Sequence, residues 1–176
     1  TVLALIVSGH LLIFTIAWIS TSVSLHQLLT FFRDRPSAIL AAKKKFVISR
    51  LGDACLIGAL ATTWYCFGTW EFSALFQVID GLRSHGAVLP PCLGWASLFL
   101  VGGALLKSAQ FPFHSWLPDT METPTPVSAL MHAGLINAGG FLVIRLSPVI
   151  ASAPGALNAL ALAGAITALY GSIVML

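Results

Sequence analysis

"LLKSAQFPFHSWLPDTMETPTP", Leu105 to Pro126, is the stretch of sequence that decides the fold. It places Lys107 directly after the apolar run "LFLVGGALL", and Pro112 follows five residues later. Proline cannot donate a backbone N–H and disrupts the helical turn before it. Backbone that leaves the helix at membrane depth is tolerated only where it faces protein or a water-filled cavity. The stretch therefore predicts a discontinuous helix beside a hydrated site, with breaks at Pro112 and Pro118.

The rest of the chain is too apolar for a soluble domain. Of its 176 residues, 57% are hydrophobic and 9% are charged, and the mean hydropathy is +0.92. A soluble domain carries about 25% charged residues, and a membrane-spanning helix needs roughly 20 apolar residues. We therefore predict an all-α, polytopic transmembrane helical bundle over residues 1–176, as a fragment of a longer protein. The predicted spans are 2–32, 46–67, 93–113, 127–146 and 156–176, the first of which is long enough to divide near Ser8-Gly9-His10.

The positive charge is concentrated in residues 33–45, called the basic segment below. It holds Arg33, Arg35 and the run Lys43-Lys44-Lys45 against one acid, Asp34. Positively charged loops stay in the cytoplasm. The basic segment is thus predicted to be a cytoplasmic loop, and alternation puts 68–92 outside and 115–126 inside. The net charge of +3 reports topology and does not predict nucleic-acid binding. A multi-pass protein of the cell inner (plasma) membrane is expected.

Ionisable residues within spans are candidates for function. Each costs about 2.5–3.5 kcal/mol at a helix centre on the insertion scale. Lys107 either takes up and releases a proton in a hydrated site or extends its charged end to the interface. His132, in the middle of a span, either relays protons or hydrogen-bonds a neighbouring helix. Asn137 is expected to form such a helix-packing bond.

Asp53, His26 and His114 are further candidates for a proton pathway. Asp53 follows Arg50 by three positions, so both lie on one helix face. The pair is either a structural ion pair or a carboxylate source for an internal network. His10 and His26 are 16 residues apart, about 24 Å along a helix, so both cannot lie at the same depth. His26, flanked by "SVSL" and "QLL", is the better interior candidate. His114 is placed to link the Lys107 region to Asp119 and Glu122.

No motif for catalysis or for a cofactor is evident in the sequence. There is no glycine-rich phosphate loop, no Ser/His/Asp arrangement and no Cys/His cluster with metal-ligand spacing. The cysteines Cys55, Cys66 and Cys92 lack CxxC spacing and are predicted to be packing residues, with no disulfide. We therefore predict no bound cofactor or metal and read no catalytic chemistry from the residues; the resemblance described next implies an ion-translocating transporter subunit and not an enzyme.

The stretch "GGALLKSAQFPFHSWLPDTMETPTPVSALMHAG" resembles the signature of the proton-translocating antiporter-like membrane subunits. This family includes the NuoL-type subunits of respiratory complex I and the Mrp antiporters. The resemblance implies a fold of about fourteen transmembrane helices with a discontinuous helix in each half, of which this chain would be the middle portion. It also implies that Lys107 and His132 lie on a central polar axis, and that Asp53 is the aspartate of the R-x-G-D element.

One departure from the family pattern concerns the counter-charge of Lys107. The family has a Trp-Glu pair whose glutamate pairs with the lysine, whereas this sequence has Trp18 and Ile19. Together with "SLHQLLTFFRDRP" and "KKKFVISRLGD", this departure resembles the DabB-like branch, the membrane subunits of the DAB inorganic-carbon accumulation system. Asp53 and His26 are then expected to do part of the work of the missing glutamate.

The branch resemblance implies a function and a partner. The protein would conduct protons, or Na+, to drive a cytoplasmic zinc-containing, carbonic-anhydrase-like (DabA-like) partner that converts CO2 to bicarbonate. One alternative is an antiporter-like subunit of a complex I, Mrp or hydrogenase assembly, where it would belong to an NADH:quinone oxidoreductase. A second alternative, of another class, is a non-conducting membrane scaffold that anchors the partner.

Overall fold

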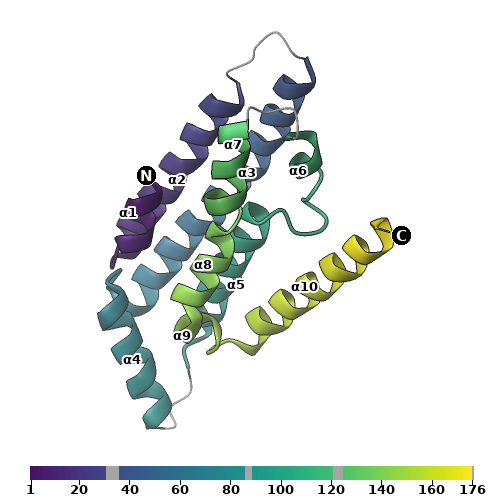
Figure 1. Cartoon of the computed structure of the whole chain (residues 1–176). Coiled ribbons are helices and arrows are strands. Elements are labelled where there is room, and N and C mark those ends of the chain that lie inside the picture. Colours follow the sequence, from purple (N-terminus) through teal and green to yellow (C-terminus); the bar gives the residue numbers. More distant parts are fainter. Residues whose placement is uncertain (31–35, 86–88, 121–124, 176) are drawn as a thin grey trace.

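A computed structural model describes residues 1–30, 36–85, 89–120 and 125–175, and these residues form helices without a β-strand. The elements in chain order are α1 (Val2–Val7), α2 (Leu11–Leu29), α3 (Pro36–Phe67), α4 (Phe72–Ser84), α5 (Pro91–Lys107), α6 (Trp116–Asp119), α7 (Thr125–Leu130), the π-helix η2 (Met131–Leu135), α8 (Ala138–Arg145), α9 (Ser147–Ile150) and α10 (Pro154–Val174) (Figure 1). The segments long and apolar enough to cross a membrane are Leu11–Leu29, Ile39–Phe67, Val127–Arg145 and Pro154–Val174. The predicted all-α, polytopic fold is confirmed.

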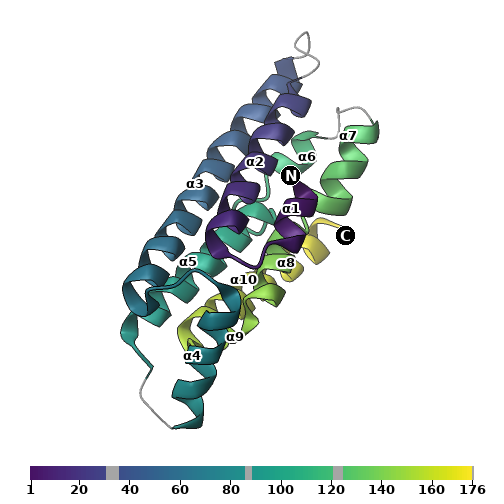
Figure 2. The same ribbon diagram turned by 90° about the vertical axis from the view of Figure 1, so that its left-hand side faces the viewer.

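Helices α2, α3 and α5 form the centre of the molecule. α2 and α3 lie side by side as an antiparallel pair in Figures 1 and 2, and α5 packs along α3. Their shared core includes Trp18 of α2, Leu56 and Ala59 of α3, and Leu100 and Ala104 of α5. Because these side chains are apolar or small, the helices approach closely. The last residue of α5, Lys107, is thereby held among them and away from solvent.

The chain leaves the helix directly after Lys107, before the predicted end of this span at residue 113. Ser108 caps α5, and Ala109 then adopts a left-handed conformation with φ of 51°. A left-handed residue cannot continue a right-handed helix, so the break precedes Pro112. Pro118 lies inside the four-residue helix α6. Its missing N–H falls in the first turn, where it costs no hydrogen bond, and it interrupts no longer helix.

The span that follows contains one turn of π-helix. Residues Met131–Leu135 form η2 between α7 and α8. The wider turn changes the carbonyl pairing, and the Asn137 amide Nδ2 donates to the carbonyls of His132 (3.1 Å) and Ala133 (3.4 Å). Asn137 therefore bonds to its own helical segment, and the expected bond to a neighbouring helix is absent from the contacts of the described residues.

The end of the molecule opposite the basic segment differs from the sequence predictions in two ways. Residues predicted as loop form α4, whose buried residues are Phe72, Leu75 and Ile79. Their three- and four-residue spacing is that of an amphipathic helix. In addition, Cys66 and Cys92 form a disulfide, so the prediction of packing cysteines was wrong for this pair. Local spacing gives no signal for a bond that joins the end of α3 to the start of α5 across 26 positions.

The basic segment is also more helical than predicted. Helix α3 begins at Pro36, at a position where a proline costs no hydrogen bond. Residues 36–45 therefore belong to a helix and not to a loop, whereas Arg33, Asp34 and Arg35 lie outside the described residues. As a consequence Lys43, Lys44 and Lys45 project from one helix in different directions: Lys43 and Lys44 are exposed and Lys45 is buried.

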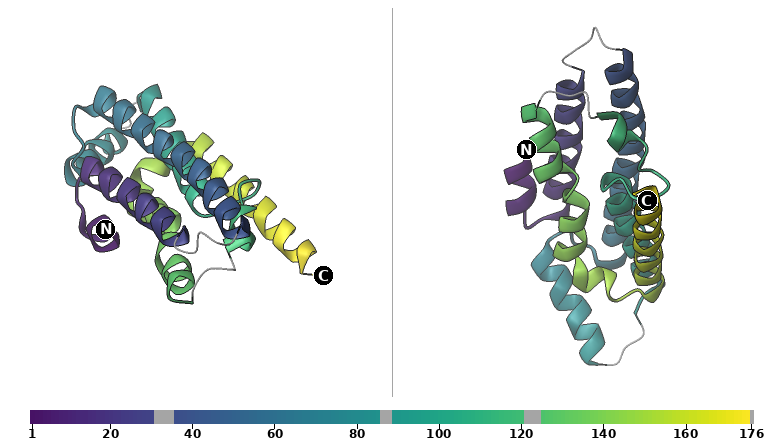
Figure 3. Two further views of the ribbon diagram at one scale, coloured as in Figure 1. Left: turned by 90° about the horizontal axis from the view of Figure 1, so that it is seen from above. Right: turned by 45° about the vertical axis from the view of Figure 1, so that its right-hand side comes forward.

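Helix α10 leaves the bundle after α9 and carries the C-terminal end away from the N-terminal end (Figure 3). Along α10 Ala156 is buried, while residues such as Leu162, Leu169 and Ile173 are exposed. Helix α10 contacts the turn that follows Lys107. The Thr167 hydroxyl of α10 accepts a hydrogen bond from the Phe111 backbone N–H at 3.1 Å. This contact holds the turn after Lys107 against α10.

Gly139 of α8 lies directly against the end of α5, and this close contact leads to a testable prediction. A Cβ atom built on Gly139 would collide with the Ser108 hydroxyl and with the backbone of Ala104, whose carbonyl carbon would lie 3.1 Å away. We expect Gly139→Ala to lower the stability of the full-length protein by about 1–3 kcal/mol, because backbone atoms cannot yield as a flexible side chain does. Thermal unfolding in detergent measures the effect. Gly140→Ala is the matched control, since a Cβ there meets nothing within 4 Å, and equal unfolding temperatures would contradict the prediction.

Candidate functional site

Lys107 is buried in a cradle of oxygen atoms from α2. Lys107 is only 7% exposed. Its Nζ donates to the Trp18 carbonyl and to the Thr21 hydroxyl, each at 3.4 Å, and also to the Ser22 hydroxyl. A protonated lysine has three N–H donors, and the cradle offers three acceptors. Nζ also lies 4.6 Å from the centroid of the Trp18 ring, a favourable position for a cation. Lys107 therefore does not extend to the interface.

The acceptors of the cradle come from one helix face. Trp18, Thr21 and Ser22 are three and four positions apart, so they lie together on the side of α2 that faces α5. The hydroxyls of Thr21 and Ser22 also donate to the Trp18 carbonyl, at 2.7 Å and 3.2 Å. Sequence reasoning did not single out these hydroxyls. The signal available was "STSVS", a cluster of small polar residues inside an apolar span.

Asp53 supplies negative charge close to the cradle. It is 4% exposed, and its Oδ2 lies 2.6 Å from Nη2 of Arg50, one turn earlier on α3. The charge of Asp53 also acts on Lys107 and Lys45. The structural ion pair with Arg50 is present, and the role of Asp53 as a carboxylate source for an internal network stays a prediction. Asp53 forms an ion pair with Arg50 and also belongs to a buried group of charges that contains Lys107.

Lys45 is the member of this group that sequence reasoning missed. It is 3% exposed, and its Nζ donates to the Ser22 carbonyl at 3.0 Å. The run of three lysines was interpreted as a topology signal alone. Nothing in the local sequence distinguishes the buried lysine from its two exposed neighbours. The distinction arises from the direction in which position 45 faces on α3.

Several polar atoms around Asp53 are buried without a hydrogen-bond partner among the described residues. They are Trp18 Nε1, Arg50 Nε and Nη2, and both carboxylate oxygens of Asp53. The Arg50–Asp53 contact is close enough for an ion pair, but its angles are not those of a hydrogen bond. Buried polar atoms of this kind are ordinarily satisfied by ordered water. The site is polar enough to hold water beside Lys107.

Position 19, where the family has its glutamate, does not carry a charge and does not bind Lys107. Ile19 is half-buried on α2, next to Trp18. The lysine instead contacts neutral oxygens at positions 18, 21 and 22, and the carboxylate that acts on it comes from α3. Within the described residues, Asp53 is the carboxylate whose charge acts on Lys107.

A cavity of about 250 Å³ adjoins the cradle on the side of the π-helix. Thr21 lines it from α2, and Ala133 and Asn137 line it from the opposite side. Its remaining lining is apolar or small and consists of Val2, Leu5, Ile6, Gly134, Leu135, Ala138 and Phe141. A water molecule occupies about 30 Å³ in the liquid, so the cavity has room for several. It connects the neighbourhood of Lys107 to the segment that carries His132.

The structure does not gather the three predicted histidines at Lys107. His26 is half-buried, with its ring 4.7 Å from that of Phe46 and its Nδ1 unpartnered among the described residues. His132 is exposed on η2. His114 lies after the helix break, with its ring 4.5 Å from that of Tyr170. The Asp119 side chain and Glu122, which His114 was expected to reach, lie outside the described residues.

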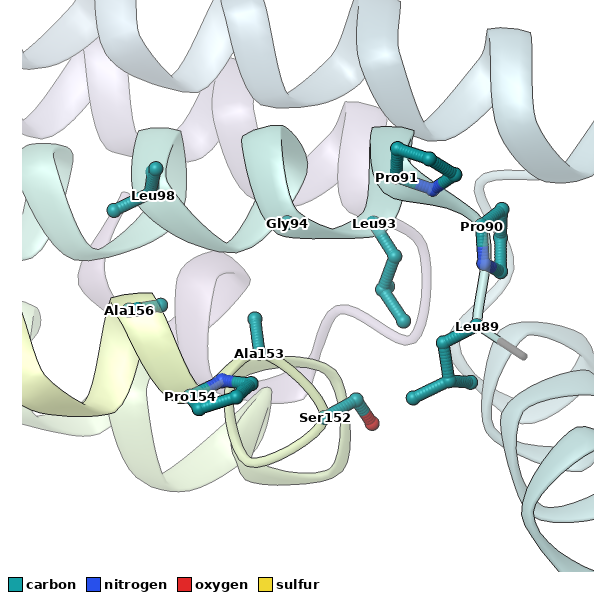
Figure 4. A pocket seen from close by; sticks show the side chains of 11 residues that line it. Leu89, Pro90, Pro91, Leu93, Gly94, Leu98, Ser152, Ala153, Pro154 and Ala156 are labelled. Carbon is teal, nitrogen blue, oxygen red and sulfur yellow. The ribbon is translucent and has the colours of Figure 1, made fainter. Parts of the chain in front are cut away.

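A further pocket of about 300 Å³ lies at the opposite end of α5 from Lys107 (Figure 4). It is formed where the start of α5 meets the α9–α10 junction, and Pro90, Pro91 and Pro154 are among its lining residues. No charged residue lines it, so it has no group that exchanges protons and is separate from the charged site. Among the described residues no cluster of His, Cys, Asp and Glu is arranged to hold a metal ion.

Comparison with known proteins identifies the class. Residues 8–176 match the family described as "NADH:quinone oxidoreductase/Mrp antiporter, TM", and the chain belongs to this family. It is a membrane subunit of the antiporter type and a multi-pass protein of the cell inner membrane, as predicted. The resemblance noted from the Lys107 stretch is confirmed.

Among curated relatives, the chain is 43% identical over 175 residues to the "Probable inorganic carbon transporter subunit DabB" of Hydrogenovibrio crunogenus, covering 99% of this chain and 33% of that protein. It is 44% identical over 174 residues to the corresponding subunit DabB2 of Halothiobacillus neapolitanus, covering 99% of this chain and 31% of that protein. A chloroplast NAD(P)H-quinone oxidoreductase subunit 5 from Lemna minor is 42% identical over 174 residues, covering 98% of this chain and 23% of that protein. The chain thus spans a third or less of the length of these relatives.

Proposed function

We propose that the full-length protein is the membrane subunit of an energy-coupled inorganic-carbon (CO2/bicarbonate) uptake system. In this role it conducts protons, or Na+ in their place, and drives a cytoplasmic carbonic-anhydrase-like partner. The observation that carries the proposal is the buried Lys107, held by three oxygens of α2 and acted on by Asp53. Burial of a charged lysine in such a site costs free energy. Ionisable residues at this depth are therefore expected to have a function, here in ion transfer.

Lys107 is the central proton carrier in this proposal. The oxygens of Trp18, Thr21 and Ser22 accept the N–H groups of the protonated side chain, and Asp53 offsets its charge. Arg50 keeps its positive charge throughout and fixes the position of the Asp53 carboxylate. The lysine can then gain and lose a proton without a change in the surrounding backbone.

The cavity beside Thr21 supports a route from Lys107 toward His132. A proton released by Lys107 passes through water in this cavity to the π-helix, where Ala133 and Asn137 line the far side. His132 is next to Ala133, and histidine side chains serve as proton shuttles in proteins. It is exposed in this part of the chain, and we propose that it faces the helices that follow. His26 and His114 stay predictions as lesser members of the pathway.

The disulfide supports the proposed orientation. Disulfides persist in oxidising compartments such as the bacterial periplasm and are rare in the cytosol. The Cys66–Cys92 bond lies at the end of α3 away from the basic segment. This placement agrees with a cytoplasmic basic segment under the positive-inside rule. A cytoplasmic partner would then meet the protein at the end of the molecule where α3 begins.

The identity of the partner provides the test of the carbon-uptake assignment. We expect the full-length protein, purified from its native membrane in mild detergent, to bring with it a zinc-containing protein of the carbonic-anhydrase type. Mass spectrometry and zinc analysis of the purified complex measure this, and a complex prepared after deletion of the co-purifying subunit is the control. A pure complex that lacks any zinc protein would contradict the assignment.

A second candidate function is favoured by the 42% identity to a chloroplast subunit named for NAD(P)H-quinone oxidoreduction. Under this alternative the protein is an antiporter-like subunit of a respiratory or hydrogenase assembly. The same purification separates the two functions, because quinone-binding or iron–sulfur subunits in place of the zinc protein would support the alternative.

A further inference from the structure

Lys45 is a buried basic residue that has no role in the proton pathway proposed above. Lysines near helix ends ordinarily extend their charged ends to water. Lys45 lies nine residues from the start of α3, about 13 Å along the helix, yet it is 3% exposed. Its Nζ turns to α2 and donates to the Ser22 carbonyl at 3.0 Å. The two preceding lysines are exposed, so burial is specific to this position.

Ser22 joins Lys45 to Lys107. The Ser22 carbonyl accepts from Lys45, and the Ser22 hydroxyl accepts from Lys107. The same hydroxyl donates to the Trp18 carbonyl at 3.2 Å, and a hydroxyl can donate and accept at once. One residue, Ser22, therefore binds two buried ammonium groups, Lys45 through its carbonyl and Lys107 through its hydroxyl.

The charges around Ser22 favour one excess proton over two. Like charges at short range repel strongly in a medium of low dielectric constant. Asp53 acts on both lysines, but its carboxylate is already paired with Arg50 at 2.6 Å. The charged groups that act on this cluster are Asp53 and Arg50, both on α3, and Lys45 also acts on Lys107. The two lysines compete for one carboxylate that Arg50 also binds.

The order of the two lysines along the membrane is fixed by the packing of α3 on α5. A Cβ on Gly52 would lie 3.5 Å from the Cβ of Leu106, so Lys107 is near the level of Gly52. Lys45 is seven residues closer than Gly52 to the start of α3, about 10 Å along the helix. It therefore lies between Lys107 and the end of the molecule that carries the exposed lysines.

We propose that Lys45 is a second proton-exchanging residue, in series with Lys107 and on the basic-segment side of it. In the transfer step the Ser22 hydroxyl turns its proton from the Trp18 carbonyl toward the neutral Lys45 amine, gives that proton to the amine, and takes one from the Lys107 ammonium. The products are a neutral Lys107 and a protonated Lys45, so the charge of the cluster is unchanged. This inference rests on the proposed proton conduction through Lys107.

The test compares variants of the full-length protein, assembled with its partner subunit, in proteoliposomes with an imposed pH gradient. We expect Lys45→Gln to lower proton flux by about a hundredfold, the lower end of what a positioned proton-transfer group contributes. Lys45→Arg is expected to be as slow, because arginine keeps the charge and the donors but does not release a proton. Lys43→Gln and Lys43→Arg, on the exposed neighbour, are matched controls and should conduct normally.

The Arg variant separates proton exchange from a structural role. Normal flux in Lys45→Arg would mean that the position needs a cation alone, and it would overturn the inference. Normal flux in Lys45→Gln would overturn it as well. Should the position 45 variants fail to assemble, Ser22→Ala keeps both lysines and the backbone carbonyl, and we expect a loss of flux of about tenfold or more; wild-type flux there would refute the relay. Lys107→Met is measured in parallel, and normal flux in that variant would instead refute the proposed function.

Discussion

Replacing Lys107 by Met in the full-length protein is expected to reduce proton flux by about a hundredfold. The lysine gives an excess proton a stable position at a depth where a charge otherwise costs about 2.5–3.5 kcal/mol. Since each 1.36 kcal/mol added to a barrier slows a rate tenfold, loss of this position corresponds to roughly a hundredfold. Met fills a similar volume without a proton site. Flux into proteoliposomes, followed with a pH-sensitive dye, measures the effect.

The control for Lys107→Met is Lys43→Met, which removes an exposed lysine from α3. This variant should conduct at the wild-type rate. The comparison also bears on the alternative that the protein is a scaffold. A scaffold would support normal carbon-dependent growth with either substitution, provided that the complex assembles. Undiminished flux and growth in an assembled Lys107→Met complex would therefore be evidence for the scaffold and against conduction.

Asp53→Asn is expected to give the second large effect, on stability as well as on flux. Removal of one partner of a buried ion pair costs about 3–5 kcal/mol, because the remaining charge stays buried without compensation. The lower end applies to Asp53, since its partner Arg50 has a side chain that is 36% exposed. Lys45 and Lys107 lose their carboxylate at the same time. Thermal unfolding of the detergent-solubilised complex, together with its proton flux, measures the outcome.

Two further variants serve as comparisons for Asp53→Asn. Asp80→Asn removes an exposed carboxylate on α4, and we expect it to leave both stability and flux unchanged. The double variant Asp53→Asn with Arg50→Gln removes both members of the ion pair. It should recover part of the stability, because an uncompensated guanidinium no longer remains. If Asp53→Asn unfolds at the wild-type temperature and conducts normally, the carboxylate is not the counter-charge of Lys107.

The sequence located Lys107 and Asp53 as candidates but not the atoms that hold them. Lys107 stands out because a cation after nine apolar residues is costly, and Asp53 because it follows Arg50 at helical spacing. The Lys107 cradle consists of a backbone carbonyl and two hydroxyls, which are common in membrane helices and gave no comparable signal. The missing glutamate at Ile19 was visible in the sequence. The placement of the Asp53 carboxylate on the same side as Lys107 depends on how α3 packs against α5.

The remaining differences arise in the same way from contacts distant in sequence. The Cys66–Cys92 bond follows from the antiparallel packing of α3 and α5. Helix α4 was not predicted, because the residues between two membrane spans were assumed to form a loop. Phe72, Leu75 and Ile79 nevertheless have the spacing of an amphipathic helix. The histidines predicted for the proton pathway are not gathered at Lys107. Within the described residues, neither His114 nor His132 contacts it.

The sequence by itself determined that the chain lies in a membrane, that a helix is interrupted in the stretch after Lys107, and which family the chain belongs to. Each of these follows from composition or from residues that are adjacent along the chain: apolar run length, Pro112 after Lys107, and an uninterrupted signature. The tertiary structure alone decided which charges meet. Burial of Lys45 and the link through Ser22 both depend on the rotation of α3 against α2. Rotation of a helix about its axis leaves hydropathy unchanged, and it is set by side-chain packing between helices.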